Sequence, residues 1–226
     1  MLYTRDAVRD NIRNRDGKRV FYLGKGDQLT SDARDFLTRE RISILPADQA
    51  RPERYRLLGG GYMEEKPEHM THLNGEFLVP KTHPRIAFRG AVDTLEAELL
   101  LSCIGASGQT RRMLEEALAY TRNLLRYEVL DEPVKDTALG GMDEKALRER
   151  SHRPQDFYGQ PHFMPSPEDS HLLLQVNRAR CAARSAELFA AAAFGNARED
   201  LLRAFNRLSS FLYLIMIQQK APQKKE

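Results

Sequence analysis

The sequence predicts a mainly α-helical protein, in which a helix bundle follows a small N-terminal α+β appendage. Two observations carry this prediction. From Pro84 onward, apolar residues recur at helical spacing through several long stretches. Before residue 46, short apolar runs alternate with turn residues and with one short helix-like piece. The hydrophobic share of 41% over 226 residues is enough to bury a core of useful size.

The appendage, residues 1–45, is expected to form a strand over 19–23, a short helix over about 32–40 and a second strand over 42–45. Glycines close the first strand, and a Thr-Ser-Asp run supplies candidate N-caps for the helix. Residues 46–70 follow as a polar connector, because they contain prolines and three consecutive glycines.

The helical domain is expected to span residues 71–219. Its expected helices cover about residues 84–103, 109–130, 143–151, 168–193 and 197–219. Residues 152–167 contain four prolines and are expected to form a loop, and the lysine-rich end 220–226 is expected to be a disordered tail. Long helices joined by modest loops are typical of a helix bundle.

Charge and cysteine content exclude several classes of protein. The chain has 35 basic and 32 acidic residues, so nucleic acid is not an expected partner. No apolar run approaches the roughly 20 residues that cross a bilayer, and no signal peptide is expected at the start. Cys103 and Cys181 form no CxxC pair, which argues against a cysteine zinc site and favours the reducing cytoplasm.

Polar residues interrupt the apolar pattern of the first long helix. Arg85, Arg89, Asp93 and Glu96 are three or four residues apart and therefore share one side of that helix. Two arginines one turn apart can hold a polyphosphate, because guanidinium groups match phosphate oxygens in a bidentate way. The alternative is a solvated face with ordinary i,i+4 ion pairs.

The two later long helices carry similar polar groups. Arg180, Arg184 and Glu187 lie on one side of the long helix among alanines, and such small neighbours let a ligand or another backbone come close. The polar residues of the last helix are Asn206, Ser209, Ser210 and Tyr213. A Walker loop and a GxGxxG motif are both absent from the sequence.

Three segments together resemble corrinoid adenosyltransferases. Residues 79–95 contain a lysine, an arginine four positions later and then Gly-Ala-Val-Asp, which is similar to a segment of that family. Residues 179–187 resemble its Arg-x3-Arg-x2-Glu helix, and residues 205–212 resemble its closing Asn-Arg-Leu-Ser-Asp motif. Residues 71–73 and 29–34 resemble the ethanolamine-utilisation branch in particular.

The resemblance implies a fold and a reaction. The expected fold is a five-helix bundle that assembles as a trimer with active sites between subunits. The expected reaction transfers the 5′-deoxyadenosyl group of ATP to Co(I) of cobalamin, with release of triphosphate. ATP with Mg²⁺ and cobalamin are the implied ligands, and a flavoprotein reductase is the implied partner. Association with a bacterial microcompartment is a further implication of that branch.

If the family's functional residues are transferred to the matching positions of this sequence, several residues would bind ATP. Lys81 would contact the phosphates, and Arg85, Arg184 and Glu187 would also bind the nucleotide. Asn206 would hold the nucleotide or its magnesium.

The resemblance also assigns roles outside the nucleotide. Arg180 would pair with Asp93 across the subunit interface, and these two with Arg184 are the expected catalytic residues. Phe163 falls where the family places an apolar residue against the lower face of the corrin.

The sequence departs from the family at two places. The glycine-rich phosphate loop is missing before Thr71, where Lys66 and Thr71 are expected to substitute for it in ATP binding. The cysteine cluster that some members use for a metal ion is also missing, so no structural metal is expected. There are two alternative functions: a non-catalytic corrinoid carrier on the same bundle, and a plain helical scaffold.

Overall fold

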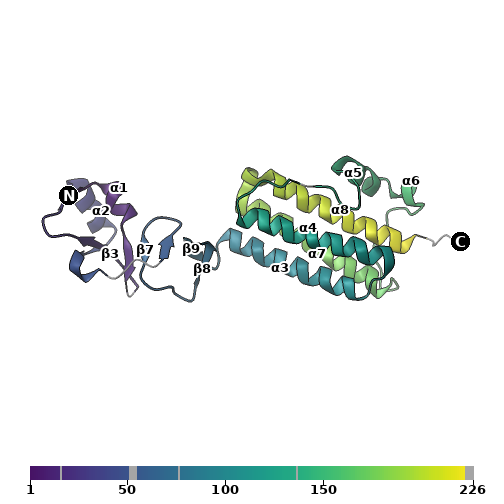
Figure 1. The fold of residues 1–226 in the computed structure, drawn as a ribbon, viewed down its shortest axis with the longest axis horizontal. Coiled ribbons are helices and arrows are strands. Elements are labelled where there is room, and N and C mark those ends of the chain that lie inside the picture. The colour runs from purple at the N-terminus through teal and green to yellow at the C-terminus, as the bar shows by residue number, and fades with distance from the viewer. Residues whose placement is uncertain (16, 51–54, 76, 136, 222–226) are drawn as a thin grey trace. The chain divides into compact units, whose positions relative to one another are not determined.

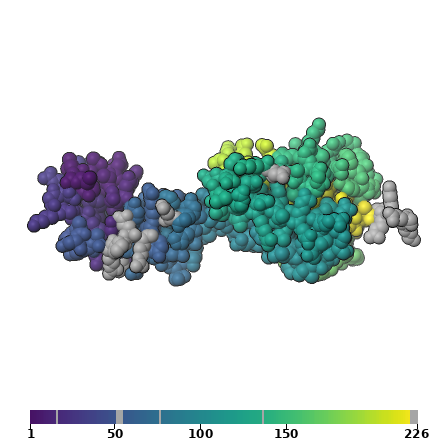
Figure 2. Space-filling view, viewed as in Figure 1, coloured from purple at the N-terminus to yellow at the C-terminus, as the bar shows by residue number. Residues whose placement is uncertain are grey.

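The protein consists of two compact units (Figure 1). The computed structural model describes residues 1–15, 17–50, 55–75, 77–135 and 137–221. The N-terminal unit is Met1–His83 and the helical unit is Pro84–Glu226. In the space-filling view, purple to blue atoms belong to the first unit and teal to yellow atoms to the second (Figure 2).

The N-terminal unit is a mixed α+β structure. Its helices are α1 (Arg5–Asp10) and α2 (Ser31–Arg39), with a 3₁₀ turn over Ala47–Gln49. Its strands are β1 (Leu2–Tyr3), β2 (Arg13–Arg15), β3 (Lys18–Leu23), β4 (Gln28–Leu29), β5 (Ser43–Pro46), β6 (Tyr55–Leu57), β7 (Tyr62–Met63), β8 (Met70–Asn74) and β9 (Phe77–Pro80). Strands β1 and β4 pair in parallel, and the larger sheet has the order β5-β3-β2-β7-β6-β9-β8.

The predicted pieces of the appendage are present as β3, α2 and β5, and Thr30 caps α2 by accepting a hydrogen bond from the Ala33 amide. The division between the units differs from the expected one. The stretch 46–70 was expected to be a connector, but it contains β6, β7 and the first residue of β8. These strands are too short to show periodicity, and the parallel pairings β2–β7 and β6–β9 join segments that are not neighbours in sequence, which local patterns cannot reveal. Positions 51–54 of that stretch lie outside the described residues.

The helical unit contains four long helices that lie side by side (Figure 1). These are α3 (Pro84–Ile104), α4 (Gly108–Val129), α7 (His171–Phe194) and α8 (Glu199–Lys220). The short helix α5 (Glu144–His152) packs against α8. The mainly helical fold, with a small sheet region before it, is therefore confirmed.

Two details differ from the predicted loop and tail. The proline-rich stretch 152–167 contains a short helix, α6 (Pro154–Tyr158), because a proline at the first helical position has the right φ and lacks only an N–H that would be orphaned. Lys220 ends α8 in regular helix, whereas positions 222–226 of the expected tail lie outside the described residues.

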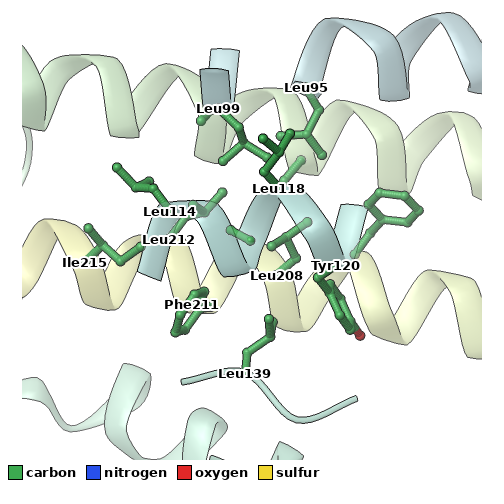
Figure 3. Packing of buried hydrophobic residues seen from close by; sticks show 14 of the residues in the cluster. Leu95, Leu99, Leu114, Leu118, Tyr120, Leu139, Leu208, Phe211, Leu212 and Ile215 are labelled. Carbon is green, nitrogen blue, oxygen red and sulfur yellow. The ribbon is translucent and has the colours of Figure 1, made fainter. Parts of the chain in front are cut away.

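The core of the helical unit forms where the apolar stripes of the helices meet (Figure 3). Leu95 and Leu99 of α3 and Leu114 of α4 are fully buried. Leu208 and Phe211 of α8 complete the centre, and the loop residue Leu139 covers Phe211 from outside the four long helices. The predicted apolar stripes are confirmed at Leu95, Leu99, Leu114 and Leu208. None of the helices in the described ranges has the length and apolar character needed to cross a membrane.

Candidate functional site

A buried carboxylate holds the first pair of predicted arginines. Glu128 of α4 is fully buried, and its Oε1 and Oε2 lie 2.6 Å from Arg85 Nε and 2.8 Å from Arg89 Nε. Arg85 also donates to the Glu128 carbonyl oxygen at 3.1 Å and lies over the ring of Phe194. We call Glu128, Arg85 and Arg89 the Glu128 cluster.

The Glu128 cluster changes the interpretation of the first helix. Surface ion pairs within α3 were the alternative to phosphate binding, yet both arginines reach across to α4. Their guanidinium groups already have a charge-assisted acceptor, so phosphate binding by Arg85 would have to compete with Glu128. Glu128 was not a candidate, although it follows the buried positions Leu114, Thr121 and Leu124 of α4 at steps of seven, three and four residues.

The polar residues of α7 and α8 meet at one point of the bundle. Asn206 Nδ2 donates to Glu187 Oε1 at 3.2 Å, which joins two predicted ATP residues from different helices. Arg184, one turn before Glu187 on α7, is exposed. Among the residues that the structure describes, none forms a hydrogen bond or ion pair with Arg184. This guanidinium is therefore available to a ligand next to the Glu187–Asn206 pair.

Neighbouring side chains fix Asn206 in place. Ser209 and Ser210 both donate to the Asn206 carbonyl oxygen, at 2.9 and 3.2 Å. Arg207 donates from Nη2 to Asn206 Oδ1 at 2.8 Å. The serines of the last helix therefore support the backbone of Asn206, and Arg207, which was not among the predicted site residues, orients its side chain.

The predicted catalytic pair is not formed within the single chain. Arg180 is half-buried and donates from Nε and Nη2 to Asn177 Oδ1, at 3.2 and 3.0 Å, on its own helix. Asp93 is exposed on α3. The predicted contact joins two subunits, so it stays a prediction.

Three predicted ATP residues belong to the N-terminal unit. Thr71 and Lys81 lie at the open end of the β8–β9 hairpin, where Thr71 pairs with Val79 and the Lys81 amide donates to the His69 carbonyl oxygen at 2.8 Å. Lys81 Nζ lies 3.6 Å from Glu68 Oε2, and both side chains are largely exposed. Lys66 lines a cleft of about 460 Å³ together with Arg15 and His69, among other residues.

Phe163 belongs to an aromatic cluster in the helical unit. Its ring stacks against Tyr213 of α8 with centroids 6.2 Å apart, and Tyr213 also stacks against His162 at 5.8 Å. The Lys220 ammonium lies over the Phe163 ring and bonds to Asp169, which holds the pKa of that carboxyl below its ordinary value. His162 was not a candidate, and the structure adds it and Tyr213 to the surroundings of Phe163.

The described ranges contain no group of three or more histidine, cysteine, aspartate or glutamate side chains arranged to hold a metal ion. The histidines that precede the bundle, His69 and His72, are exposed, and the His72 ring lies 5.8 Å from that of Tyr55. Both Cys103 and Cys181 are free thiols, and burial raises the pKa of Cys103.

Comparison with known proteins identifies relatives of this chain. A family model described as cobalamin adenosyltransferase matches residues 61–219. The chain is 30% identical over 158 residues to the corrinoid adenosyltransferase EutT of Salmonella typhimurium (strain LT2) and equally to that of Escherichia coli (strain K12). Each match covers 68% of this chain and 59% of the relative, so the chain spans about three fifths of the length of these curated relatives.

Proposed function

We propose that this protein is an ATP:corrinoid adenosyltransferase, because the chain belongs to the cobalamin adenosyltransferase family. In the proposed reaction, the electron pair of Co(I) attacks C5′ of ATP. A Co–C bond forms, the bond between C5′ and the triphosphate oxygen breaks, and triphosphate leaves as adenosylcobalamin is produced. The substrates are thus ATP and a reduced corrinoid, and the protein contributes positioning and charge stabilisation.

The observation that carries the proposal is the meeting of α7 and α8. The Asn206–Glu187 hydrogen bond of 3.2 Å joins two predicted nucleotide residues, and the exposed guanidinium of Arg184 lies one turn away from Glu187. In the proposed role, Arg184 binds the polyphosphate, since a guanidinium matches phosphate oxygens and stabilises the charge that develops on the leaving group. For Lys81, at the end of the β8–β9 hairpin, contact with the phosphates is proposed from the family resemblance alone.

Magnesium would enter with ATP. The Glu187 carboxylate supplies oxygen ligands, which hard divalent cations prefer, and the Asn206 carboxamide oxygen would join them after releasing its hydrogen bond from Arg207. A bound Mg²⁺ would neutralise phosphate charge, and these two side chains are the ones that would hold it.

The proposed assembly is a trimer of five-helix bundles with α3, α4, α5, α7 and α8 as the five helices. Exposed apolar side chains support a subunit interface on α3 and α7: Leu100, Leu101 and Ile104 on α3, and Leu188 and Phe189 on α7. The same two helices carry exposed Asp93 and half-buried Arg180. An interface on these helices would let Asp93 of one subunit reach Arg180 of the next.

The proposed setting is the cytoplasm, where both thiols stay reduced, with a flavoprotein that reduces the corrinoid. Association with a bacterial microcompartment belongs to the same proposal, because the sequence resembles the ethanolamine-utilisation branch of the family.

The deciding assay mixes the purified protein with ATP and chemically reduced cobalamin and follows the visible spectrum. Adenosylcobalamin should appear together with stoichiometric triphosphate. The missing glycine-rich phosphate loop is the one feature that favours a non-catalytic corrinoid carrier. A carrier would bind cobalamin without an ATP-dependent spectral change, and a plain scaffold would bind neither ligand.

A further inference from the structure

A cleft of about 780 Å³ lies between α5 and α8 in the helical unit. Four cationic side chains line it: Lys145 and Arg148 from α5, and Arg203 and Arg207 from α8. Glu144, Glu149 and His152 line it as well. Cations therefore outnumber carboxylates by four to two, and they approach the space from two helices.

The carboxylates of the cleft do not neutralise these cations. Glu149 lies 3.8 Å from Arg153, which is outside the cleft lining. Within the described parts of the chain, no hydrogen bond or ion pair joins Lys145, Arg148 or Arg203 to a carboxylate. Like charges that face one another across a concave surface repel, and they create a positive potential that attracts an anion.

Arg207 gives the cleft a polar group that lacks an acceptor. Its Nη2 donates to Asn206 Oδ1 at 2.8 Å, whereas its Nε is buried and has no hydrogen-bond partner among the described residues. A buried donor without an acceptor costs free energy, so the Arg207 guanidinium at the wall of the cleft has hydrogen-bonding capacity that the chain does not use.

We propose that the cleft between α5 and α8 binds a phosphate group of a reactant or product, an inference that rests on the proposed adenosyltransferase function. Arginines from two walls suit phosphate oxygens, because each guanidinium offers paired donors in a plane. The space also lies in the size range of small-molecule sites.

The reaction offers two sources of that phosphate. The first is triphosphate, and the Arg207–Asn206 bond links the cleft to the predicted nucleotide residues. The second is the phosphodiester in the nucleotide loop of cobalamin. His162 Nε2 lies 3.1 Å from the His152 carbonyl oxygen, which links the cleft to the aromatic cluster around Phe163.

The test measures equilibrium binding to the full chain of three probes: inorganic triphosphate, cobalamin, and cobinamide, a corrinoid that lacks the nucleotide loop. The variants are Arg148→Gln and Arg203→Gln, one from each wall, and neither residue belongs to the predicted ATP or corrin contacts. Arg122→Gln is the matched control, because Arg122 is an exposed arginine of α4 that pairs with Glu96 outside the cleft.

Each cleft variant should lower the binding affinity for one probe by about fivefold or more, because a cation is lost beside a bound phosphate. Weaker triphosphate binding alone identifies the first source. Weaker cobalamin binding with unchanged cobinamide binding identifies the second. Unchanged affinity for all three probes, or an equal loss for cobalamin and cobinamide, overturns the inference. These binding measurements do not need turnover. If the cleft variants weaken binding but the unmodified protein has no adenosyltransferase activity, the proposed function alone is rejected. If the protein is active and the cleft variants bind every probe normally, the inference alone is rejected.

Discussion

Two arginine pairs in the helical unit have the same spacing but opposite surroundings. Arg85 and Arg89 of α3 are one turn apart, about 20% exposed, and both bonded to the fully buried Glu128. Arg180 and Arg184 of α7 are also one turn apart, but Arg180 contacts a neutral amide on its own helix and Arg184 is exposed. One buried carboxylate partly offsets the charge of the first pair, whereas the second pair has no carboxylate partner among the described residues.

The difference separates a stabilising role from a binding role. A charge paired with a buried carboxylate stabilises the fold, because removing either partner leaves the other desolvated and unpaired. A charge in solvent beside a carboxylate–amide pair adds little to stability and is free to meet an incoming anion. Substitutions in the two pairs should therefore separate stability from activity.

The largest expected effect is on the Glu128 cluster. Glu128→Ala leaves Arg85 and Arg89 without their shared acceptor, and we expect the free energy of unfolding to fall by about 3–5 kcal/mol. Urea denaturation followed by far-ultraviolet circular dichroism measures this loss, since most of the helix signal comes from the helical unit.

Glu115→Ala is the matched control for Glu128→Ala. Glu115 lies on the same helix and pairs with Arg111 at 2.6 Å, but both side chains are about half exposed. We expect its removal to cost less than about 1 kcal/mol. Equal urea midpoints for Glu128→Ala and Glu115→Ala would show that the buried cluster does not stabilise the fold.

The sequence predicts most of the helical unit because its helices are long and periodic. Val92, Leu95 and Leu99 of α3 follow one another at steps of three and four residues, as one face of a helix requires, and all three are fully buried. The strands β6 to β9 could not be predicted in the same way, because two to five residues show no clear period and the pairings β2–β7 and β6–β9 join strands that are not neighbours in sequence.

The candidate site was predictable where a residue acts alone and less so where it depends on a partner. The stripe of α4 contains Glu128 in register with Leu114 and Leu124, so a carboxylate at a core position was visible in the sequence. What the sequence did not show is which cations meet it, because Arg85 is 43 residues away and reaches it only through helix packing. The Glu187–Asn206 contact is similar in kind, but there the family motif already pointed to both residues.

Arg184→Ala should lower activity without lowering stability, the opposite of what we expect for Glu128→Ala. We expect ATP binding or turnover to weaken by at least about tenfold, because losing a charged hydrogen-bond partner costs roughly 1.5–3 kcal/mol. The urea midpoint should stay unchanged, since Arg184 is exposed. Titration with ATP and steady-state kinetics measure the effect.

Arg178→Ala is the matched control for Arg184→Ala, because Arg178 lies on α7, is 67% exposed and pairs with Glu98. Its ATP affinity should match that of the unmodified protein. Unaltered kinetics in a folded Arg184→Ala protein would remove Arg184 from the site.

A smaller effect is expected at Asp93, the proposed partner of Arg180 in a neighbouring subunit. Asp93→Ala should reduce activity by about fivefold and raise the protein concentration at which the oligomer dissociates, because it leaves Arg180 without its carboxylate. Light scattering and activity at several protein concentrations measure both. The double variant Asp93→Arg with Arg180→Asp should recover part of the assembly if the two residues are in contact. A fully active monomer would refute the interface.

The smallest expected effect on stability is that of removing metal ions. No group of side chains arranged to hold a metal ion is found among the described residues, so we expect metal-free protein to keep its melting temperature. A chelator should still stop catalysis, because Mg²⁺ bound with ATP would lose its place beside Glu187 and Asn206. Elemental analysis of the purified protein, with melting curves before and after chelation, tests both statements. Added Mg²⁺ alone should restore turnover. Stoichiometric zinc or iron, with a large fall in melting temperature on its removal, would contradict the expectation. The residues to test next would then be His69, His72 and His83. Their spacings of three and eleven residues, without cysteine partners, are the reason that no zinc site is expected there.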